Sequence, residues 1–437
     1  MEKILRFLEK NIIPDFLYRL GQPVYHFCLA FLGAFYYGFP SKKMMVIGVT
    51  GTKGKSTTCY LIYQILNSLG IKTGLITTVK IGIGIDEWDN MFKQTMPGRF
   101  QSQELLARMA KEKCHYVVVE TSSEGILQYR YSFIDYDAAV FLNLSPEHIE
   151  RHGGFENYRD AKVKLFKKVA KKKNSVGVYN LDDENVQYFL EPRINHQYVF
   201  TSKLPDSLIR LPNLYHITDI QLKPQKTAFS LNGEKFEMPL VGEFNIYNVV
   251  AAICAVLSQG INVKQIKETL LKVKAPAGRM EFIEQGQDFI VIVDYAHEPA
   301  SLESVYKAAK IFLKPGAKKI CLLGSQGGGR DKWKRPVMGK IAAKYCDKII
   351  LTNEDPYDED PSAILKDIRT GISRRAGVYQ IINRKEAIRK ALSLAKKGDV
   401  IVLTGKGGEK LMCVENNKKI RWDETDVVKK LIGELVN

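Results

Sequence analysis

The sequence predicts an α/β protein with a short helical N-terminal segment, a central domain built on a mainly parallel sheet, and a Rossmann-like C-terminal α/β domain. From Met44 onward, apolar strand-like runs alternate with segments of helical spacing, the pattern of a parallel sheet covered by helices. A proline-containing break, "KAPAGRME", separates a first series of this kind from a second. We therefore expect domains at residues 1–43, 44–276 and 277–437.

The N-terminal segment is unusual because no charged residue occurs between Leu20 and Ser41. Its length approaches that of a membrane span, but Gln22, Pro23, His26 and three glycines dilute its apolar character. We favour a helix packed on the next domain. Peripheral membrane or protein contact through residues 20–41 is the alternative, and a true span is the least favoured interpretation.

Composition narrows the classes of partner and the compartment. Lysine and arginine total 65 against 48 acidic residues, a net charge of +17 that suits anionic ligands. No arginine-rich arm or aromatic-interleaved basic motif occurs, so we expect no nucleic-acid partner. Seven dispersed cysteines without a CxxC pair predict reduced thiols and a cytoplasmic protein. We expect a monomer or weak oligomer.

The central domain opens on a phosphate-loop pattern, "VIGVTGTKGKSTT". An apolar strand precedes the loop and helical spacing follows it, so backbone N–H groups and a helix dipole can hold an anion. Val49 stands where the common Walker motif has glycine, which makes this a compressed variant. The pattern predicts a P-loop-type ATPase domain whose ATP-binding residues include Gly51, Thr52, Lys53, Gly54, Lys55, Ser56 and Thr57, with Ser56 also a magnesium ligand.

Further strands and helices complete the two domains. "YVVVETSS" and "AAVFLNLS" read as buried strands that end in polar residues, and ligands gather at the carboxyl ends of such strands. "VAAICAVLSQGI" and "IKETLLKV" read as the helices that close the central domain. The strands expected in the second series are "FIVIVDYA", "KICLLGS", "KIILTNE" and "DVIVLTG".

Taken together, these motifs resemble the Mur ligases, the ATP-dependent amide-bond-forming enzymes of cell-wall synthesis, and most of all those of the MurE type. After "GTKGKS" the resemblance continues in order through "ETSSEGILQYR", "NLSPEHIERHGGFENYRDAKVKLF", "GEFNIYN", "AGRME", "VDYAHEPASL", "GGGRDKWKRPVMG" and "TGKGGE". MurE adds the third amino acid to UDP-N-acetylmuramoyl-L-alanyl-D-glutamate. The resemblance therefore implies an anionic peptide or nucleotide-sugar acceptor and an amino acid as substrates.

The implied chemistry needs ATP and magnesium. ATP phosphorylates a carboxylate, the amine attacks the acyl phosphate, and the anionic oxygens that crowd together need cations. The resemblance implies two magnesium sites, with Ser56, Glu120, His148 and Lys162 as ligands, the lysine after carbamylation by carbon dioxide. A lone histidine such as His148 more often has a structural role. The strand and the asparagine that precede it here favour a metal ligand. His148 and His152 could suggest zinc, which the absence of a third ligand motif disfavours.

The resemblance also assigns residues around the substrates. Catalytic roles fall to Lys55, Glu120, His148, Lys162 and Arg279. Nucleotide contacts are implied for Asn245, Asn248, Arg279, Asp294 and His297. Contacts with the acceptor are implied for Thr95, Pro97, Ser122, Gln128 and Arg130. The incoming amino acid is expected at Arg330, Glu354, Asp355, Tyr357, Gly405 and Glu409.

One departure concerns the amino acid. MurE enzymes that choose meso-diaminopimelate usually carry Asp-Asn-Pro-Arg, and Tyr357 replaces that arginine here. Acidic residues surround the position, so a cationic side chain such as that of L-lysine or L-ornithine is expected. The alternative interpretation is a solvent-exposed acidic turn, "NEDPYDEDP".

A second departure concerns the acceptor. MurE has a folded N-terminal domain that holds uridine diphosphate, whereas Met1 to Lys43 precede the loop here, so we expect that part to be absent, shrunken or replaced. This keeps open a ligase that extends a different γ-glutamyl, pseudomurein or poly-glutamate acceptor. A nucleotide-binding scaffold subunit is the non-enzymatic alternative.

Overall fold

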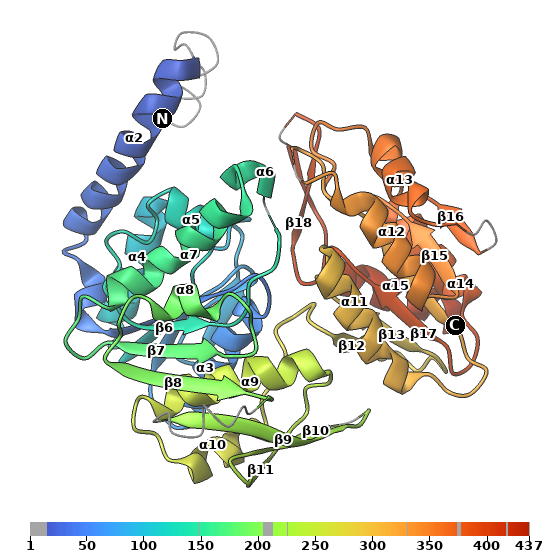
Figure 1. The fold of residues 1–437 in the computed structure, drawn as a ribbon. Coiled ribbons are helices and arrows are strands. Elements are labelled where there is room, and N and C mark those ends of the chain that lie inside the picture. The colour runs from blue at the N-terminus through green and yellow to red at the C-terminus, as the bar shows by residue number, and fades with distance from the viewer. Residues whose placement is uncertain are drawn as a thin grey trace.

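The computed structural model describes residues 15–147, 149–203, 213–224, 226–329, 331–373, 377–416 and 418–436. Two α/β domains lie side by side, each with helices on both faces of its sheet, and the N-terminal helix α2 extends away from the first domain (Figure 1). The predicted α/β fold is confirmed.

The first domain contains a mixed sheet with a parallel centre. The parallel strands, in spatial order, are β2 (Thr73–Ile76), β5 (Tyr116–Glu120), β1 (Met45–Thr50), β6 (Tyr136–Phe141), β7 (Val176–Asn180), β8 (His196–Thr201) and β9 (Leu214–Leu222). Antiparallel strands extend both edges: β3 (Lys80–Ile83) and β4 (Asp86–Asp89) beside β2, and β10 (Thr227–Leu231) and β11 (Glu234–Met238) beside β9. The sequence analysis did not predict these antiparallel edges.

Alternating side chains of the central strands build two cores. Ile47 and Val49 of β1 pack in one core with helices α3 (Lys55–Ser68), α9 (Glu243–Leu257) and α10 (Val263–Leu270). Val46 faces the other core, with α4 (Arg99–Lys111), α7 (Phe155–Val169) and α8 (Val186–Leu190). Because both faces of the sheet are covered, its central strands read as continuous apolar runs. Short helices α5 (Ser123–Leu127) and α6 (Ile149–His152) complete the domain.

The C-terminal domain has a second, smaller sheet. Its spatial order is β12 (Glu281–Ile283), β13 (Ile290–Val293), β17 (Val400–Leu403), β14 (Lys319–Leu323), β15 (Lys348–Leu351) and β16 (Val378–Gln380), with only β12 antiparallel. One face is covered by α11 (Pro299–Ala308), which continues into the short η3 (Ala309–Phe312), and by α12 (Lys334–Tyr345) and α13 (Pro361–Thr370). The other carries α14 (Arg384–Leu394) and α15 (Glu424–Val436), and β18 (Leu411–Val414) pairs with β19 (Lys418–Arg421).

The N-terminal helix packs on the first domain through part of its length. Helix α2 (Asp15–Tyr36) is followed by the short helix η1 (Pro40–Lys43). The rings of Phe27 and Phe31 meet Phe133 edge-on, with centroids 5.3 and 5.5 Å apart. No helix within the described ranges has both the length and the apolar character that crossing a bilayer demands.

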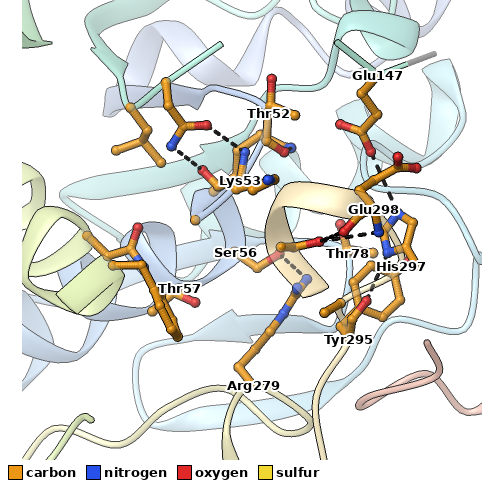
Figure 2. A pocket seen from close by; sticks show the side chains of 18 of the residues that line it. Thr52, Lys53, Ser56, Thr57, Thr78, Glu147, Arg279, Tyr295, His297 and Glu298 are labelled. Carbon is orange, nitrogen blue, oxygen red and sulfur yellow. Dashed lines mark hydrogen bonds and ion pairs between the residues drawn. The ribbon is translucent and has the colours of Figure 1, made fainter. Parts of the chain in front are cut away.

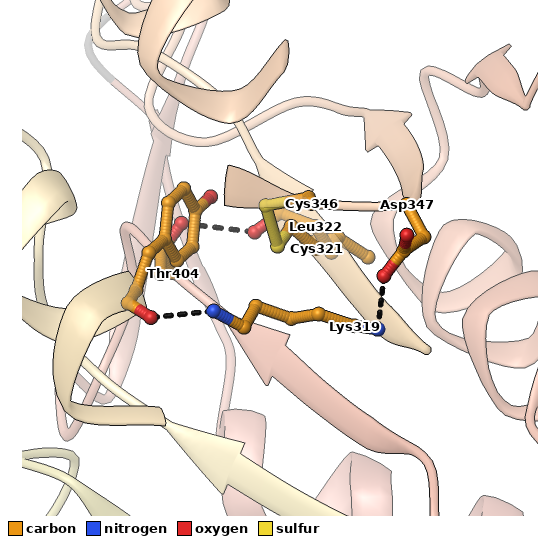
Figure 3. Close-up of a disulfide and its surroundings, with 7 residues drawn as sticks. Lys319, Cys321, Leu322, Cys346, Asp347 and Thr404 are labelled. Atoms are coloured by element: carbon orange, nitrogen blue, oxygen red, sulfur yellow. Dashed lines mark hydrogen bonds between the residues drawn. A yellow bond between two sulfur atoms is a disulfide. The ribbon is translucent and has the colours of Figure 1, made fainter. Parts of the chain in front are cut away.

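Two of the seven cysteines form a disulfide, although the sequence analysis predicted reduced thiols. Cys321 of β14 and Cys346 at the end of α12 form a disulfide, beside the hydrogen bond between Lys319 and Asp347 (Figure 3). The two Cα atoms lie 6.0 Å apart, within the range that a disulfide spans. The packing of the end of α12 against β14 therefore brings together two cysteines that the sequence spacing did not connect. The remaining five cysteines are free.

Candidate active site

The phosphate loop joins the end of β1 to the start of α3, as predicted. Gly54 lies immediately before the helix with a φ of 82°. A Cβ atom at this position would sit 2.0 Å from Asn248 Oδ1, so only glycine fits. Asn143 holds the loop from the opposite side, because its side-chain oxygen accepts a hydrogen bond from the Lys53 backbone N–H over 2.9 Å. The loop is thus fixed by contacts from two other segments.

Buried oxygen atoms meet beside the loop. Ser56 Oγ donates a hydrogen bond to Glu120 Oε2 over 2.8 Å, and Thr78 donates to the same oxygen from its backbone N–H and its hydroxyl. Glu120 is buried at the carboxyl end of β5. A hydroxyl next to a carboxylate is the donor set that Mg2+ prefers, so Ser56 and Glu120 fit a magnesium site.

Lys162 is a buried lysine next to this loop. It lies on α7 with 1% of its surface exposed, and its Nζ donates to the Gly51 carbonyl over 2.6 Å. Tyr158 covers the ammonium group, with its ring centroid 4.6 Å away. Burial and the nearby charge of Lys55 hold the pKa of Lys162 well below its ordinary value. A lysine in this state is available to react as a neutral amine.

The start of the C-terminal domain also reaches the loop. Arg279 Nη2 donates a hydrogen bond to Ser56 Oγ over 3.3 Å, and the guanidinium stacks on Tyr295 (Figure 2). Asp294 accepts hydrogen bonds from the Met280 and Ala296 backbone N–H groups. Asp294 therefore anchors the backbone next to Arg279, while burial raises its own pKa.

A second contact between the domains forms at His297. Its Nε2 lies 3.6 Å from Glu147 Oε1 of the first domain, and its Nδ1–H donates to the Tyr295 carbonyl (Figure 2). Glu298 follows in the chain and pairs with Lys334. Burial would lower the pKa of His297, but the Glu147 and Glu298 carboxylates raise it overall. The imidazole is thus poised to be a cation that links the domains.

The asparagines of "GEFNIYN" lie on the first turns of α9. Asn245 and Asn248 are both buried, and Asn248 Nδ2 donates to Asn245 Oδ1 over 3.1 Å. Asn245 in turn donates to the Val241 carbonyl. The pair is therefore held rigidly against the phosphate loop.

The residues predicted to contact the acceptor form a cluster beyond β5. Arg130 donates from one nitrogen to Gln94 Oε1 over 2.7 Å and from another to Gln128 Oε1. The Thr95 and Thr78 hydroxyl oxygens lie 2.9 Å apart in a hydrogen bond, which links this cluster to Glu120. Ser122 caps α5, since its Oγ accepts from the Gly125 N–H.

The residues predicted for the amino acid form a pocket of buried charges. Asp355 and Glu409 both accept hydrogen bonds from Lys406, over 2.9 and 2.8 Å. Lys93, from the loop that follows β4, pairs with the same two carboxylates. Burial would raise the pKa of Asp355, but the two ammonium groups lower it overall. The alternative interpretation, a solvent-exposed acidic turn, is therefore wrong for Asp355 and for Glu354, which are both fully buried.

Glu354 has a different environment from Asp355. Neither of its carboxyl oxygens makes a hydrogen bond within the described part of the chain, and burial raises its pKa. Gly405 packs closely on it, because a Cβ atom there would lie 2.6 Å from Glu354 Oε2.

These groups surround one cavity of about 950 Å³ between the domains. Of the predicted residues, the cavity is lined by Thr52, Lys53, Gly54, Lys55, Ser56, Thr57, Thr95, Glu120, Ser122, Gln128, Arg130, Lys162, Asn245, Asn248, Arg279, Asp294, His297, Asp355, Tyr357 and Glu409. Gly51, Pro97, Glu354 and Gly405 are not among the lining residues. His148 and Arg330 lie outside the described residues.

Comparison with known families decides the identity. The family profile for the Mur ligase middle domain matches residues 49–256, and that for the Mur ligase, glutamate ligase domain matches residues 278–407. The chain belongs to the Mur ligase family. Members of this family are ATP-dependent ligases that use Mg2+, and this Mur ligase is therefore an ATP-dependent ligase of the acid–amino-acid class.

Individual relatives of this Mur ligase are of the MurE type. It is 36% identical over 420 residues to the UDP-N-acetylmuramoyl-L-alanyl-D-glutamate–2,6-diaminopimelate ligase of Syntrophomonas wolfei, covering 94% of this chain and 83% of that one. It is 37% identical to the UDP-N-acetylmuramyl-tripeptide synthetase of Treponema denticola, covering 92% and 79%. A solved 2,6-diaminopimelate ligase structure matches with a TM-score of 0.60 at 30% identity, covering 90% and 79%.

A folylpolyglutamate synthase from Mycobacterium tuberculosis shares the fold of this Mur ligase. Its TM-score is 0.69 at 17% identity, with 92% of this chain and 95% of that chain covered. At this identity the likeness concerns the fold alone.

Sequence reasoning missed four residues of the site. Thr78 and Lys93 lie in segments without a recognisable motif, and Glu147 stands next to His148 inside a quoted motif without a role of its own. Lys406 stands inside the quoted "GKGGE", where a buried lysine between two acidic partners could have been suspected. Their contacts join segments far apart in the sequence, so local patterns did not reveal them.

Proposed function

We propose that this Mur ligase joins an amino acid to the D-glutamate γ-carboxylate of a muramoyl-dipeptide precursor. The acceptor we favour is UDP-N-acetylmuramoyl-L-alanyl-D-glutamate, and the amino acid is a diamino acid such as L-lysine. The names of the relatives support the acceptor, since those proteins are MurE-type ligases. The departure at Tyr357 supports an amino acid other than diaminopimelate.

One observation carries the proposal: a single cavity contains groups suited to all three substrates. The phosphate loop, the cluster around Arg130 and the pocket around Glu409 all line it. An acyl phosphate must be formed and consumed without release to water, because water would hydrolyse it. A shared cavity allows the amine to reach the activated carbon where it is made.

The first half of the reaction is phosphoryl transfer. A carboxylate oxygen of the acceptor attacks the γ-phosphorus of ATP, the bond to the β-phosphate oxygen breaks, and ADP leaves. We assign Lys55 and Arg279 to stabilising charge on the transferred group, because both cations line the cavity beside Ser56. Ser56 and Glu120 would hold a magnesium ion, which neutralises phosphate charge when bound.

We assign a second metal position to Lys162 after carbamylation. The neutral amine would attack carbon dioxide and lose a proton, giving an anionic oxygen ligand. Its burial and its lowered pKa support this assignment. His148 remains our proposed partner ligand, and Arg330 our proposed contact for the amino acid.

The second half is amide formation. The amine of the incoming amino acid attacks the acyl carbon, a tetrahedral intermediate forms, and inorganic phosphate leaves. We assign Asp355 and Glu409 to binding the side chain of the amino acid, and Arg130 with Gln128 and Ser122 to holding the acceptor. Arg130 suits an anionic acceptor because it is a half-buried cation that lines the cavity.

A panel of substrates tests the proposal. The protein is incubated with ATP, Mg2+, one acceptor and one amino acid, and phosphate release and product mass are measured. Release that requires the muramoyl dipeptide together with a diamino acid supports it. Release with a γ-glutamyl, pseudomurein or poly-glutamate acceptor instead would favour the alternative ligase. A protein that binds ATP but releases no phosphate with any acceptor would favour the scaffold interpretation.

We also propose that α2 contacts an acidic lipid surface peripherally. Its free side exposes Val24, Leu32, Phe35 and Tyr36, the last at 75% of its surface. No charge interrupts residues 21–41, and the exposed Lys42 and Lys43 follow directly. An apolar helix flanked by cations on a protein of net charge +17 suits an anionic interface.

Vesicle flotation tests the proposed lipid contact. The protein should float with phosphatidylglycerol vesicles, and Leu32→Glu with Phe35→Glu should abolish this. Ile85→Glu is the matched control, because Ile85 is 92% exposed but isolated from α2. Equal flotation with neutral lipid, or none with either, would contradict the proposal and favour a protein partner.

A cytoplasmic location, a monomeric or weakly associated state, and the domain limits 1–43, 44–276 and 277–437 remain further proposals.

A further inference from the structure

A cation from the first domain fills the amino-acid pocket of the second. Lys93 lies between β4 and α4, and its Nζ is 3.0 Å from Asp355 Oδ2 and also pairs with Glu409. Its side chain is only 10% exposed. Its backbone has a φ of 57°, a conformation that lysine adopts at a cost, so surrounding contacts must hold it there.

The charge balance explains why the pocket attracts a second cation. Asp355 and Glu409 carry two negative charges, and the fully buried Lys406 supplies one positive charge from the same domain. One negative charge remains, and the neighbouring Glu354 carboxyl has no hydrogen-bond partner within the described ranges. A buried carboxylate without compensation is costly. The pocket therefore contains two ammonium groups, Lys406 from its own domain and Lys93 from the first domain.

Lys93 lies where a bound ligand could reach its carboxylate partners. Lys93, Asp355 and Glu409 line the same cavity as Lys55 and Ser56 of the phosphate loop. An amino acid that placed a side-chain ammonium beside Asp355 would extend from this pocket into that cavity. Such a side chain would match the chemistry already present, a primary ammonium on a flexible aliphatic chain.

We infer that Lys93 is an internal substitute for the side-chain ammonium of the incoming amino acid and leaves the pocket when that amino acid binds. The inference rests on the proposed function for the identity of the substrate as an amino acid. It makes Lys93 a residue that sets selectivity, because a neutral side chain cannot replace its charge. Lys93 is also two positions from Thr95. Its release from the pocket would therefore move the backbone next to the cluster predicted to bind the acceptor.

Lys93→Met tests the inference by direct binding. If Lys93 fills the pocket in about nine molecules out of ten, its removal should tighten L-lysine binding by about tenfold. Isothermal titration of the full chain with L-lysine measures this, and L-norleucine, its neutral counterpart, should gain nothing. Lys80→Met is the matched control, because Lys80 pairs with Asp89 on the adjacent hairpin, away from the pocket. Thermal unfolding checks that both variants are folded, and Lys93→Gln provides a second neutral replacement.

Three results would overturn the inference. These are weaker binding of L-lysine by Lys93→Met, unchanged binding, or an equal gain for L-norleucine. Weaker binding would mean that Lys93 itself contacts the substrate. The titration needs no acceptor, so a protein that fails to release phosphate with the muramoyl dipeptide would contradict the proposed function while leaving the Lys93 result readable.

Discussion

Arg279 and Ser56 connect the two domains at the phosphate loop. Arg279 Nη2 donates to Ser56 Oγ over 3.3 Å although the residues are 223 positions apart. Because Ser56 also donates to Glu120, a cation, a hydroxyl and a carboxylate form one continuous chain of contacts. The side chain of Ser56 therefore links Arg279 of the C-terminal domain to Glu120 of the first domain.

This contact predicts a large decrease in kcat for Arg279→Ala. Removing the guanidinium that we propose stabilises the transferring phosphate should lower kcat by about a hundredfold or more. Arg279→Lys should recover part of the loss, since it keeps the charge but not the geometry. Steady-state phosphate release measures both, with the exposed Arg421→Ala as control. An Arg279→Ala enzyme with near-normal kcat would show that this contact is only structural.

Lys55→Ala should abolish turnover. The ammonium of Lys55 lies in the cavity and is held by the Thr52 carbonyl over 2.8 Å, ready to meet a phosphate oxygen. We expect kcat to fall by about a hundredfold or more while the unfolding temperature changes little. Phosphate release and thermal unfolding are the two measurements. Full activity of Lys55→Ala would contradict the assignment of this loop to ATP binding.

Lys162→Ala should stop catalysis in a way that bicarbonate does not repair. A short carboxylate such as formate should restore part of the activity, because it can occupy the place of the carbamate oxygens. Lys164→Ala is the control, as that lysine is exposed on the same helix. Carbon-13 NMR of wild-type protein in labelled bicarbonate provides an independent readout. The absence of a carbamate signal in active enzyme would contradict the assignment.

The contact between His297 and Glu147 predicts a pH-dependent stability. The pKa of His297 is raised above its ordinary 6.5, so protonation is favoured in the folded state. Its stabilising contribution is then complete below that value and is lost as pH rises through the folded-state pKa. The difference in unfolding temperature between wild type and His297→Gln should shrink as the pH rises above about 6.5. A difference that stays constant over this range would show that the pair carries no charge.

The amino-acid preference is open to a direct test. Once Lys93 is displaced, Asp355, Glu409 and Lys406 leave the pocket with one negative charge, which would repel the distal carboxylate of diaminopimelate and attract an ammonium group. Two charges about 4 Å apart interact by roughly 4 kcal/mol near a protein surface before desolvation, so tenfold discrimination needs only a fraction of this. We expect a higher kcat/KM for L-lysine or L-ornithine than for meso-diaminopimelate. Asp355→Asn should weaken this preference and Tyr357→Arg should shift it towards diaminopimelate, while a tenfold wild-type preference for diaminopimelate or a neutral amino acid would refute it.

Apolar runs and glycine spacing in the sequence predicted the central strand β1 and the loop that follows it. The apolar run before Gly51 is a buried central strand because helices cover both faces of the sheet, and the glycines match a loop in which Gly54 meets Asn248. The antiparallel edges were not predicted, since short strands such as β3 and β4 carry little periodic signal.

The site was predictable where a motif carries its own chemistry and not where distant segments meet. Glu120, Lys162 and Lys55 come from separate motifs, and all three line the same cavity. The pairing of Lys93 with Asp355 joins residues 262 positions apart, and no spacing rule connects them. The predicted acidic pocket is thus already neutralised by lysines.

The transfer of oxygen from acceptor to phosphate tests the central claim most directly. The acceptor dipeptide is prepared with oxygen-18 in its γ-carboxylate and is turned over with ATP, Mg2+ and L-lysine, and the released phosphate is analysed by mass spectrometry. Activation as an acyl phosphate predicts one oxygen-18 atom in each phosphate released, together with one new amide bond. Unlabelled phosphate, or phosphate formed without an amide product, would contradict the account.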